Sequence, residues 1–232
     1  MSNDFSLKQF DIKQEHTALK VGTDGLLLGA WADGGKHILD IGTGTGLISL
    51  MMAQRFPAAF VDAIDIDADA ASQAEENVLH SPFADRVSVR CVSIQNYSVE
   101  RRYDSIVCNP PYFTHSLLSP DAKRTLARHS VALPFDELFQ NASRLLSDDG
   151  RFSIVVPVDA SSQIDTYAAI AGLFLVRRCL VRTTPKKQPR RMLLTFSSNP
   201  SPIVEEEGVI QNGPSEPSEW YRNLTRDFLL KY

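Results

Sequence analysis

A polar tetrapeptide that ends an apolar run is the part of this sequence best suited to chemistry. Residues 106–108 favour a strand, and Asn109-Pro110-Pro111-Tyr112 follows them directly. Two consecutive prolines cannot donate ladder hydrogen bonds, so the strand must end there, and each proline keeps the residue before it extended. The stiff loop offers an amide side chain, a backbone carbonyl and an aromatic ring. This set can hold a planar base by its amino group; the alternative is an ordinary proline-stiffened turn.

A glycine-rich turn earlier in the chain is the second candidate. Asp40-Ile41-Gly42-Thr43-Gly44-Thr45-Gly46-Leu47 follows a short apolar run, and its three glycines allow a sharp turn and a close backbone approach to a ligand. A dinucleotide site has the pattern G-x-G-x-x-G. Here Leu47 stands at the third glycine position and Gly46 comes one residue early. The loop therefore departs from the pyrophosphate pattern, and alone it leaves the kind of nucleotide open.

An acidic residue after the next apolar run indicates which kind of nucleotide the glycine-rich turn could bind. Ribose hydroxyls are often held by an acidic residue about 20 positions beyond such a loop, at the end of the next strand. Asp65 stands at this distance from Gly42, and the apolar Ile66 beside it can cover an adenine face. Asp67 is expected to cap the following helix, which is the alternative role for Asp65 also. Together the loop and Asp65 indicate an adenosine-containing cofactor.

A parallel sheet is needed to bring these residues together. Apolar runs alternate with amphipathic segments, which predicts βαβ units whose strand ends share one edge. The expected strands are 37–41, 60–64, 86–91, 103–108, 151–156, 174–182 and 192–196, and the expected helices are 24–32, 46–56, 67–79, 135–146, 159–172 and a terminal one from Trp220. Residues 5–16 suit a short strand or a packed arm. Thr23 or Asp24 is a candidate N-cap, and Gly150 a stop for the helix before it.

Two regions stand apart from this pattern. Residues 113–134 have little apolar periodicity and are expected to form a partly helical insertion above the site. For its His115 and His129, a structural role in hydrogen bonding is favoured over a role as catalytic base. Arg124 and Arg128 could face a phosphate or solvent. Residues 197–218 contain many Ser, Pro and Asn and a Glu205-Glu206-Glu207 run, so we expect a mobile connection there.

A local excess of positive charge suggests a nucleic-acid contact. The chain has a net charge of −4, yet seven basic and no acidic residues lie between positions 177 and 191. Phosphate backbones are bound by such clusters, and the alternative is a solvated hairpin loop. The basic residues proposed to contact the substrate are Lys186, Lys187, Arg190 and Arg191.

Composition favours a single cytoplasmic domain. The chain has 232 residues, 43% of them hydrophobic and 22% charged. Its three widely separated cysteines indicate reduced thiols and neither a disulfide framework nor a metal site. No run reaches the ~18 apolar residues of a membrane span, and the amino terminus lacks the core of a signal peptide. We divide the domain into an N-terminal extension and helix (1–33), a catalytic core (34–197), and a mobile connection with a C-terminal helix (198–232).

With these motifs assembled, the chain resembles class I S-adenosylmethionine-dependent methyltransferases. The glycine loop, Asp65 and Asn109-Pro110-Pro111-Tyr112 carry the resemblance, and the last is typical of enzymes that methylate amino or amide nitrogens. Lys20-Val21-Gly22-Thr23-Asp24-Gly25, the basic 185–191 loop and the 224–228 segment are similar to bacterial enzymes that N6-methylate adenine 37 in tRNA1(Val). The resemblance runs from about Phe10 to Tyr232. It implies a Rossmann-like, mostly parallel seven-stranded sheet with helices on both faces and an antiparallel C-terminal strand.

The resemblance also implies roles for single residues. S-adenosylmethionine would be the cofactor and tRNA the substrate, with no membrane and no obligatory protein partner. One departure concerns Ser93, because many relatives have an acidic residue there that contacts the cofactor adenine. The hydroxyl would accept a weaker, charge-free hydrogen bond. The implied cofactor-binding residues are Thr23, Asp40, Gly42, Gly44, Gly46, Asp65, Ile66, Ser93 and Asn109.

The expected mechanism addresses a poor nucleophile. The adenine N6 lone pair is delocalised into the ring, and Asn109 Oδ1 with the Pro110 carbonyl would accept the two N6 hydrogens and direct the nitrogen at the methyl group. Tyr112, with Phe113, would stack on the base, which is worth ~1–3 kcal/mol. Positioning and preorganised dipoles would supply most of the rate, so no strong base is required.

Several alternatives remain open from the sequence. The same tetrapeptide serves N6-adenine methylation of rRNA or DNA and N5-methylation of glutamine in proteins. A nicotinamide-dependent oxidoreductase is disfavoured by Leu47 at the third glycine position. A non-catalytic RNA-binding Rossmann domain is disfavoured by the presence of both Asp65 and Asn109.

Overall fold

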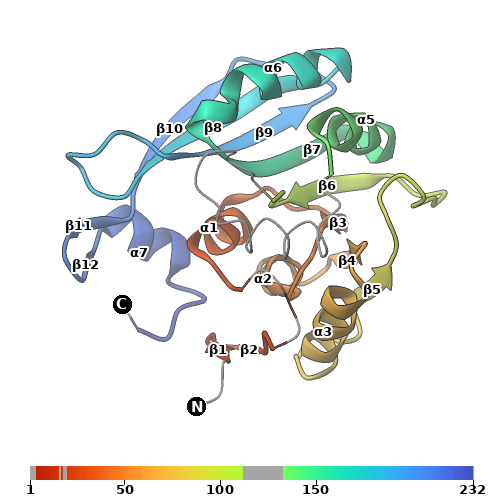
Figure 1. Ribbon diagram of the computed structural model, residues 1–232, viewed down its shortest axis with the longest axis horizontal. Coiled ribbons are helices and arrows are strands. Elements are labelled where there is room, and N and C mark those ends of the chain that lie inside the picture. The colour runs from red at the N-terminus through yellow and green to blue at the C-terminus, as the bar shows by residue number, and fades with distance from the viewer. Residues whose placement is uncertain (1–3, 16, 18–19, 112–132, 232) are drawn as a thin grey trace, which may run out of the picture.

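The computed structural model describes residues 4–15, 17, 20–111 and 133–231. At its centre is an eight-stranded sheet of order β10-β8-β9-β7-β6-β3-β4-β5 (Figure 1). Only β9 runs antiparallel to its neighbours, β7 and β8. The predicted class I methyltransferase sheet with an antiparallel C-terminal strand is therefore confirmed, with one further strand at its edge. The strands are β3 (His37–Ile41), β4 (Phe60–Asp65), β5 (Val87–Cys91), β6 (Tyr103–Cys108), β7 (Leu146–Pro157), β8 (Phe174–Arg182), β9 (Arg191–Ser197) and β10 (Val204–Val209).

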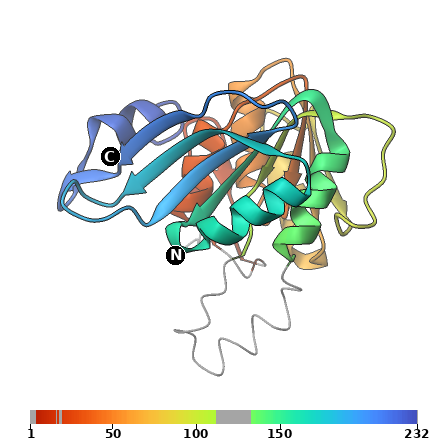
Figure 2. The same ribbon diagram turned by 90° about the horizontal axis from the view of Figure 1, so that it is seen from above.

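Helices cover both faces of this sheet (Figures 1 and 2). The helices α1, α2, α3 and α7 share one hydrophobic core with one face, and α5 and α6 share a second core with the other. Successive side chains of a strand point to opposite faces, so Ile38 enters the first core and Leu39 the second. Because both faces of the sheet are covered by helices, the central strands carry apolar side chains on both sides. The helices are α1 (Thr23–Trp31), α2 (Leu47–Arg55), α3 (Ala68–Leu79), α5 (Phe135–Leu145), α6 (Ser161–Ile170) and α7 (Glu219–Thr225), with a 3₁₀ turn, η1 (Val158–Ala160).

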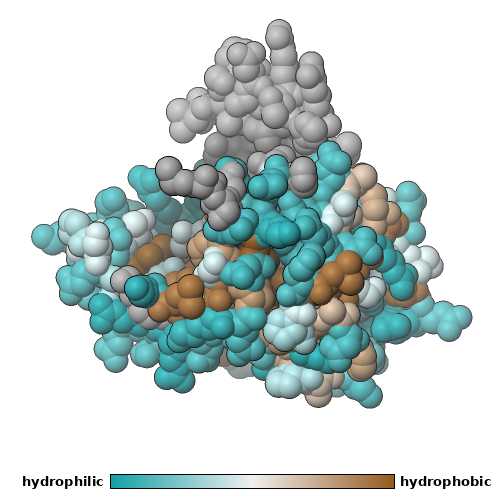
Figure 3. Space-filling view, turned by 90° about the horizontal axis from the view of Figure 1, so that it is seen from below, coloured by the Kyte–Doolittle hydropathy of each residue, from teal (hydrophilic) through white to brown (hydrophobic). Residues whose placement is uncertain are grey.

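The described segments near both ends of the chain contribute to the first core, through Leu7, Phe10 and Phe228. The expected N-terminal arm forms two short strands, β1 (Phe5–Ser6) and β2 (Asp11–Ile12), and Leu7 bridges to Leu229. A second small pair, β11 (Gln211–Gly213) and β12 (Glu216–Pro217), precedes α7. Seen from below, the surface shows apolar residues in small groups between polar ones (Figure 3). Within the described residues, no helix has the length and apolar character needed to cross a bilayer.

The segment expected to be a mobile connection is instead part of the sheet. Residues 204–209 pair in parallel with β8 as its edge strand, β10. All three glutamates of the run form ion pairs with β8: Glu205 with Arg178, Glu206 with Arg177 and Glu207 with Arg182, at 2.6, 2.5 and 3.3 Å. The composition of the acidic run alone suggested a loop. Its arginine partners lie about 27 positions earlier in the chain, so a reading of the run by itself could not reveal the pairing.

Two predicted helix ends were wrong. Gly150 lies within β7 and does not terminate α5, which ends at Leu145. A Cβ at Gly150 would lie 2.8 Å from the Tyr103 carbonyl oxygen, so close packing against β6 explains the glycine. Helix α1 has Gly22 as its N-cap with no side-chain capping bond, so neither Thr23 nor Asp24 caps it.

Candidate active site

The end of β3 is the point around which the site is arranged. Ile41 pairs with Ile64 of β4 on one side and with Cys108 of β6 on the other. The three strands are parallel, so the loops that leave their carboxyl ends begin side by side. The glycine loop therefore lies between Asp65 and Asn109, as the sequence motifs require.

The glycine loop is open toward solvent at its first two glycines. Gly42, Gly44 and Gly46 have φ angles of 70°, 57° and 82°, which side-chain-bearing residues rarely adopt. A Cβ added to Gly42 or Gly44 would meet no atom within 4 Å, so ligand atoms can approach the backbone there. Gly46 differs, because it is the N-cap of α2 and its Cβ position lies 3.4 Å from Ala74 of α3. It shapes the turn and packs on α3.

Asp40 is a fully buried carboxylate beneath this loop. Its Oδ2 accepts hydrogen bonds from Thr43 Oγ1 at 2.7 Å and Ser49 Oγ at 2.6 Å. Its Oδ1 is buried without a hydrogen-bond partner among the described residues. Burial raises the pKa of Asp40 to about 6, although the two hydroxyl donors oppose the rise. A cationic ligand group beside Oδ1 would stabilise the ionised form.

Asp65 holds the other side of the loop. Its Oδ2 accepts from Gly44 N at 2.8 Å and its Oδ1 from Asp67 N at 3.0 Å. Each oxygen keeps a second lone pair, which a ribose hydroxyl can use. Burial raises the pKa of Asp65, against the lowering effect of these backbone donors. Ile66, next in the chain, has 51% of its surface exposed and is available to cover a base.

Ser93 lies in the next loop along the same sheet edge. Asp65 pairs with Cys91 at the end of β5, and Val92 N donates to the Asp65 carbonyl at 2.8 Å. Ser93 is half-buried just beyond. The sheet thus groups three of the predicted cofactor contacts, Asp65, Ile66 and Ser93, on the β4–β5 side of the glycine loop.

Asn109 leaves β6 on the opposite side. It is half-buried, Pro110 is buried and Pro111 is half-buried. The first turn of α1 lies against Asn109, because a Cβ at Gly25 would be 3.9 Å from Asn109 Nδ2. Thr23, at the start of that turn, is exposed. The remaining predicted site residues, Tyr112, Phe113, His115, Arg124, Arg128 and His129, lie outside the described residues.

The basic stretch between 177 and 191 has two distinct parts. The three β8 arginines are paired with β10, as described above. Arg191 is also paired, because its Nε donates to Asp24 Oδ2 at 2.7 Å. A contact of Arg191 with an RNA phosphate would therefore have to compete with Asp24. Lys186, Lys187 and Arg190 are exposed on the β8–β9 loop.

Three supporting residues were not found by sequence reasoning. Ser49 donates to Asp40 from the first turn of α2. Asn77 is 2% exposed, and its Nδ2 donates to the Thr45 carbonyl at 2.8 Å, which ties the glycine loop to α3. The signal for Asn77 was a polar residue on the buried stripe of an amphipathic helix. The third residue is Gly25, whose backbone lies close to Asn109. A glycine at the start of an apolar helix was the sequence signal for it.

Comparison with known proteins defines the family. Residues 15–174 match the model of the methyltransferase small domain. A curated relative from Phocaeicola vulgatus, named tRNA1(Val) (adenine(37)-N6)-methyltransferase, is 46% identical over 228 residues, with 97% of each chain covered. This chain belongs to that methyltransferase family. Its class I fold and its use of S-adenosylmethionine follow from this membership.

Solved structures agree on the fold. A predicted O-methyltransferase from Agrobacterium tumefaciens superposes with a TM-score of 0.69 at 19% identity, covering 88% of this chain and 96% of the other. A glycopeptide N-methyltransferase in complex with S-adenosylmethionine gives a TM-score of 0.56 at 10% identity, covering 78% and 90%. At these identities the likeness concerns the fold alone.

The described residues fit this cofactor. S-adenosylmethionine is a cation that carries a ribose and an adenine. Asp40 Oδ1, which has no hydrogen-bond partner in the described part of the chain, suits a positive group. The open backbone at Gly42 and Gly44 admits close approach, and Asp65 has lone pairs for a ribose diol. Ile66 and Ser93 are placed for the base, one by its apolar surface and one by its hydroxyl.

Replacement of Asp40 by asparagine should weaken cofactor binding and remove part of its pH dependence. Ionised Asp40 favours a cation, so wild-type affinity should be constant above pH 6 and fall as the pH drops through about 6. Asp40→Asn should lose roughly 10- to 100-fold in affinity at pH 7.5, the scale of a charge-assisted hydrogen bond. Calorimetric titration of both proteins with S-adenosylmethionine between pH 5.5 and 7.5 measures this.

The same titrations contain their own control. Asp65 is unchanged in the variant, so any pH dependence that persists belongs to other groups. Burial disfavours the Asp40 charge and raises the pKa of this carboxyl, so removing the charge should not lower the Tm at pH 7.5. Wild-type affinity and pH profile in Asp40→Asn would show that Asp40 does not contact the cofactor.

Proposed function

We propose that this protein transfers the methyl group of S-adenosylmethionine to N6 of adenine 37 in tRNA1(Val). The observation that carries the proposal is the position of Asn109-Pro110-Pro111, which leaves β6 beside the open glycine loop. The proposed cofactor loop, which supplies the methyl group, and the proposed acceptor loop would then be neighbours at one edge of the sheet. The name of the Phocaeicola vulgatus relative supports the substrate. A tRNA substrate implies a cytoplasmic location.

The acceptor residues would act by orientation. Asn109 Oδ1 and the Pro110 carbonyl would accept the two N6 hydrogens, which localises the nitrogen lone pair and turns it out of conjugation. Pro110 is followed by a second proline, so no N–H from residue 111 competes near this carbonyl. Bound S-adenosylmethionine supplies an activated methyl on a sulfonium. The protein needs no strong base, because the N6 proton becomes acidic once the nitrogen is alkylated.

The target adenine must leave its stack to reach Asn109. Unstacking costs a few kcal/mol and is cheapest in a single-stranded loop. We assign Tyr112 and Phe113 to stacking on the extruded base, worth ~1–3 kcal/mol per base. Arg124 and Arg128 would meet the RNA backbone near it. These four assignments rest on the sequence.

The β8–β9 loop is the proposed contact with the RNA backbone. Lys186, Lys187 and Arg190 are exposed, whereas the arginines of β8 are neutralised by β10. The loop leaves the sheet at the carboxyl end of β8 and returns at Arg191, which pairs with Pro157 at the carboxyl end of β7. The RNA-binding charge would therefore stand at the same edge as the acceptor loop. We treat the 232-residue chain as a single methyltransferase domain.

Asn109→Ala should strongly lower the rate of methyl transfer and leave cofactor binding within a few-fold of the wild type. The amide is assigned to the acceptor base, while the adenosine contacts lie across β3. Loss of an orienting and polarising group of this kind typically costs on the order of 10²- to 10³-fold in rate. Labelled-methyl transfer to unmodified tRNA, with cofactor affinity by calorimetry, measures both. Near-normal transfer by the variant would refute the role of Asn109.

Neutralising the β8–β9 loop should weaken RNA binding and not the chemical step. A Lys186→Gln, Lys187→Gln, Arg190→Gln triple variant should raise KM for tRNA roughly tenfold or more and lower the slope of log KM against log salt. The kcat should change little. Arg178→Gln is the matched control, because Arg178 is neutralised by Glu205 at an exposed edge. Equal effects of the triple variant and the control would exclude the loop as the RNA contact.

A glutamine side chain in a protein is the alternative acceptor, because its amide nitrogen poses the same chemical problem. Such an enzyme would be indifferent to ribonuclease treatment of the substrate and to the triple variant.

A further inference from the structure

The pair formed by Arg191 and Asp24 joins two parts of the protein that the proposed function uses separately. Arg191 is the first residue of β9, directly after the basic β8–β9 loop, and its backbone neighbour Arg190 donates to Val181 O at 3.0 Å. Asp24 lies in the first turn of α1, 167 positions earlier in the chain. The two side chains are 36% and 25% exposed, so the pair is partly shielded from solvent.

The first turn of α1 borders the acceptor loop. Gly25, next to Asp24, is buried, and a Cβ there would lie 3.4 Å from Leu47 Cδ2 and 3.9 Å from Asn109 Nδ2. The ion pair therefore links the end of the basic loop to the first turn of α1, and the backbone of that turn lies close to the Asn109 amide. A displacement of this turn would change the surroundings of the Asn109 amide.

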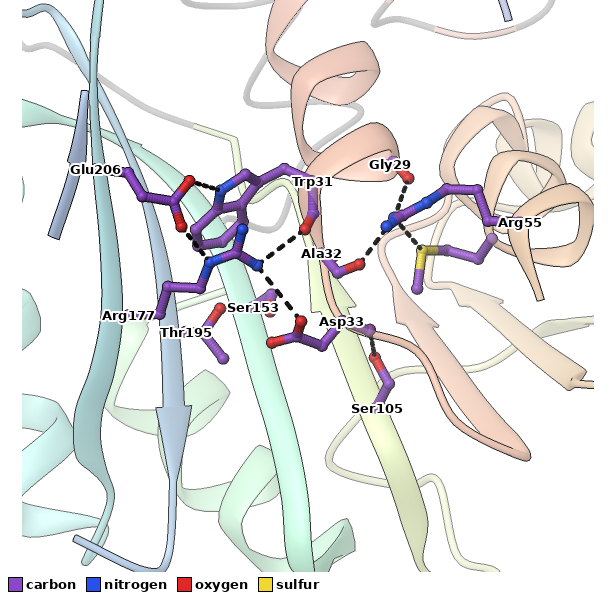
Figure 4. Close-up of polar contacts among 11 residues, drawn as sticks. Gly29, Trp31, Ala32, Asp33, Arg55, Ser105, Ser153, Arg177, Thr195 and Glu206 are labelled. Carbon is purple, nitrogen blue, oxygen red and sulfur yellow. Dashed lines mark hydrogen bonds and ion pairs between the residues drawn. The ribbon is translucent and has the colours of Figure 1, made fainter. Parts of the chain in front are cut away.

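The opposite end of α1 is anchored independently. Trp31 Nε1 donates to Glu206 Oε2 at 3.1 Å, and the Arg177 guanidinium lies over the Trp31 ring at 4.0 Å while its Nε contacts the same glutamate (Figure 4). Arg55 donates to two carbonyl oxygens at that end, at 2.9 and 2.7 Å. The C-terminal end of α1 is thus held by several contacts, and the Arg191–Asp24 ion pair lies at its other end, beside the site.

We propose that the Arg191–Asp24 ion pair is a positioning device: it fixes the first turn of α1, and through that turn the alignment of Asn109, beside the RNA-binding β8–β9 loop. Arg191 and Asp24 touch neither substrate nor cofactor in this account. Arg191 acts by holding Asp24, and Asp24 by fixing the first turn of α1. The inference rests on the proposed function, since it assigns the loop to RNA and Asn109 to the base.

The two roles open to Arg191 predict opposite outcomes for Asp24→Asn. If Arg191 positions α1, loss of the pair should lower kcat for tRNA methylation roughly 10- to 100-fold, the scale of a displacement near the reacting atoms, with KM for tRNA within about twofold. If Arg191 is a phosphate ligand, removing the carboxylate frees it, so KM for tRNA should fall while kcat stays unchanged. That second result would overturn the proposal.

A double-mutant cycle gives an independent reading. Arg191→Gln should reproduce the loss of kcat, and the Asp24→Asn, Arg191→Gln double variant should be no worse than the poorer single variant, because both remove one interaction. Arg191→Lys, which keeps an ion pair, should recover most of the rate. Additive effects in the double variant, or effects confined to KM, would contradict the proposal.

Controls separate this inference from the function on which it rests. Cofactor affinity within about threefold of the wild type shows that each variant is folded, and the two single variants alter different partners of the pair. Arg178→Gln, which removes an equal charge from β8, should leave kcat and KM within about twofold. Absence of tRNA methylation by the wild type would overturn the proposed function and this inference together. Normal wild-type activity with KM effects alone would overturn only the inference.

Discussion

The register of β3 with its two neighbours is the constraint on which the site depends. Ile41 pairs with Ile64 and Cys108, so the residues that follow these three positions emerge together from the sheet. A slip of one residue in either strand would turn the side chains of that strand to the opposite face. The two cores hold the register, because Ile38 and Leu39 must enter different layers. Packing far from the chemistry thus fixes the distance between the donor and acceptor loops.

Within that frame, one unfavourable local feature coincides with a proposed ligand contact. The loop glycines Gly42, Gly44 and Gly46 adopt positive φ, which glycine does without strain, whereas the buried Asp40 carboxylate keeps one oxygen without a partner among the described residues. An unpaired buried acceptor costs about 1–3 kcal/mol. Thr43 and Ser49 offset part of this cost through Oδ2, and a bound cation would offset the rest. The arrangement is that of a site preorganised for charge, with stability contributed by the surrounding sheet.

The parts predicted well from the sequence are those encoded by neighbouring residues. Apolar runs between glycine and proline signals marked the strands of the core, and Asp67 caps α3 through bonds to Asp69 N and Ala70 N as its position suggested. The motifs named the loops at the sheet edge because each is contiguous. The N-cap of α1 was misassigned, because Asp24 is engaged by a residue from β9 and Gly22 adopts the capping backbone conformation.

The failures involve partners distant in the chain. The Glu205–Glu207 run has a composition typical of a loop, but it pairs in parallel with β8, where its glutamates meet three arginines. The same pairing removes three arginines from the apparent basic patch, and Asp24 removes a fourth. A count of charge along the sequence cannot detect neutralisation across strands. It therefore overestimated the proposed RNA-binding surface, which keeps Lys186, Lys187 and Arg190 among the described residues of that stretch.

The central claim is that donor and acceptor sides meet at β3 to methylate one adenine of one tRNA. The most direct measurement incubates the protein with labelled S-adenosylmethionine and two unmodified tRNA1(Val) transcripts, one with adenine and one with guanine at position 37, and then identifies the product nucleoside by mass spectrometry. The account predicts N6-methyladenosine in the first transcript and no label in the second. Equal labelling of both transcripts, or label found only in protein when cell extract is supplied, would contradict it.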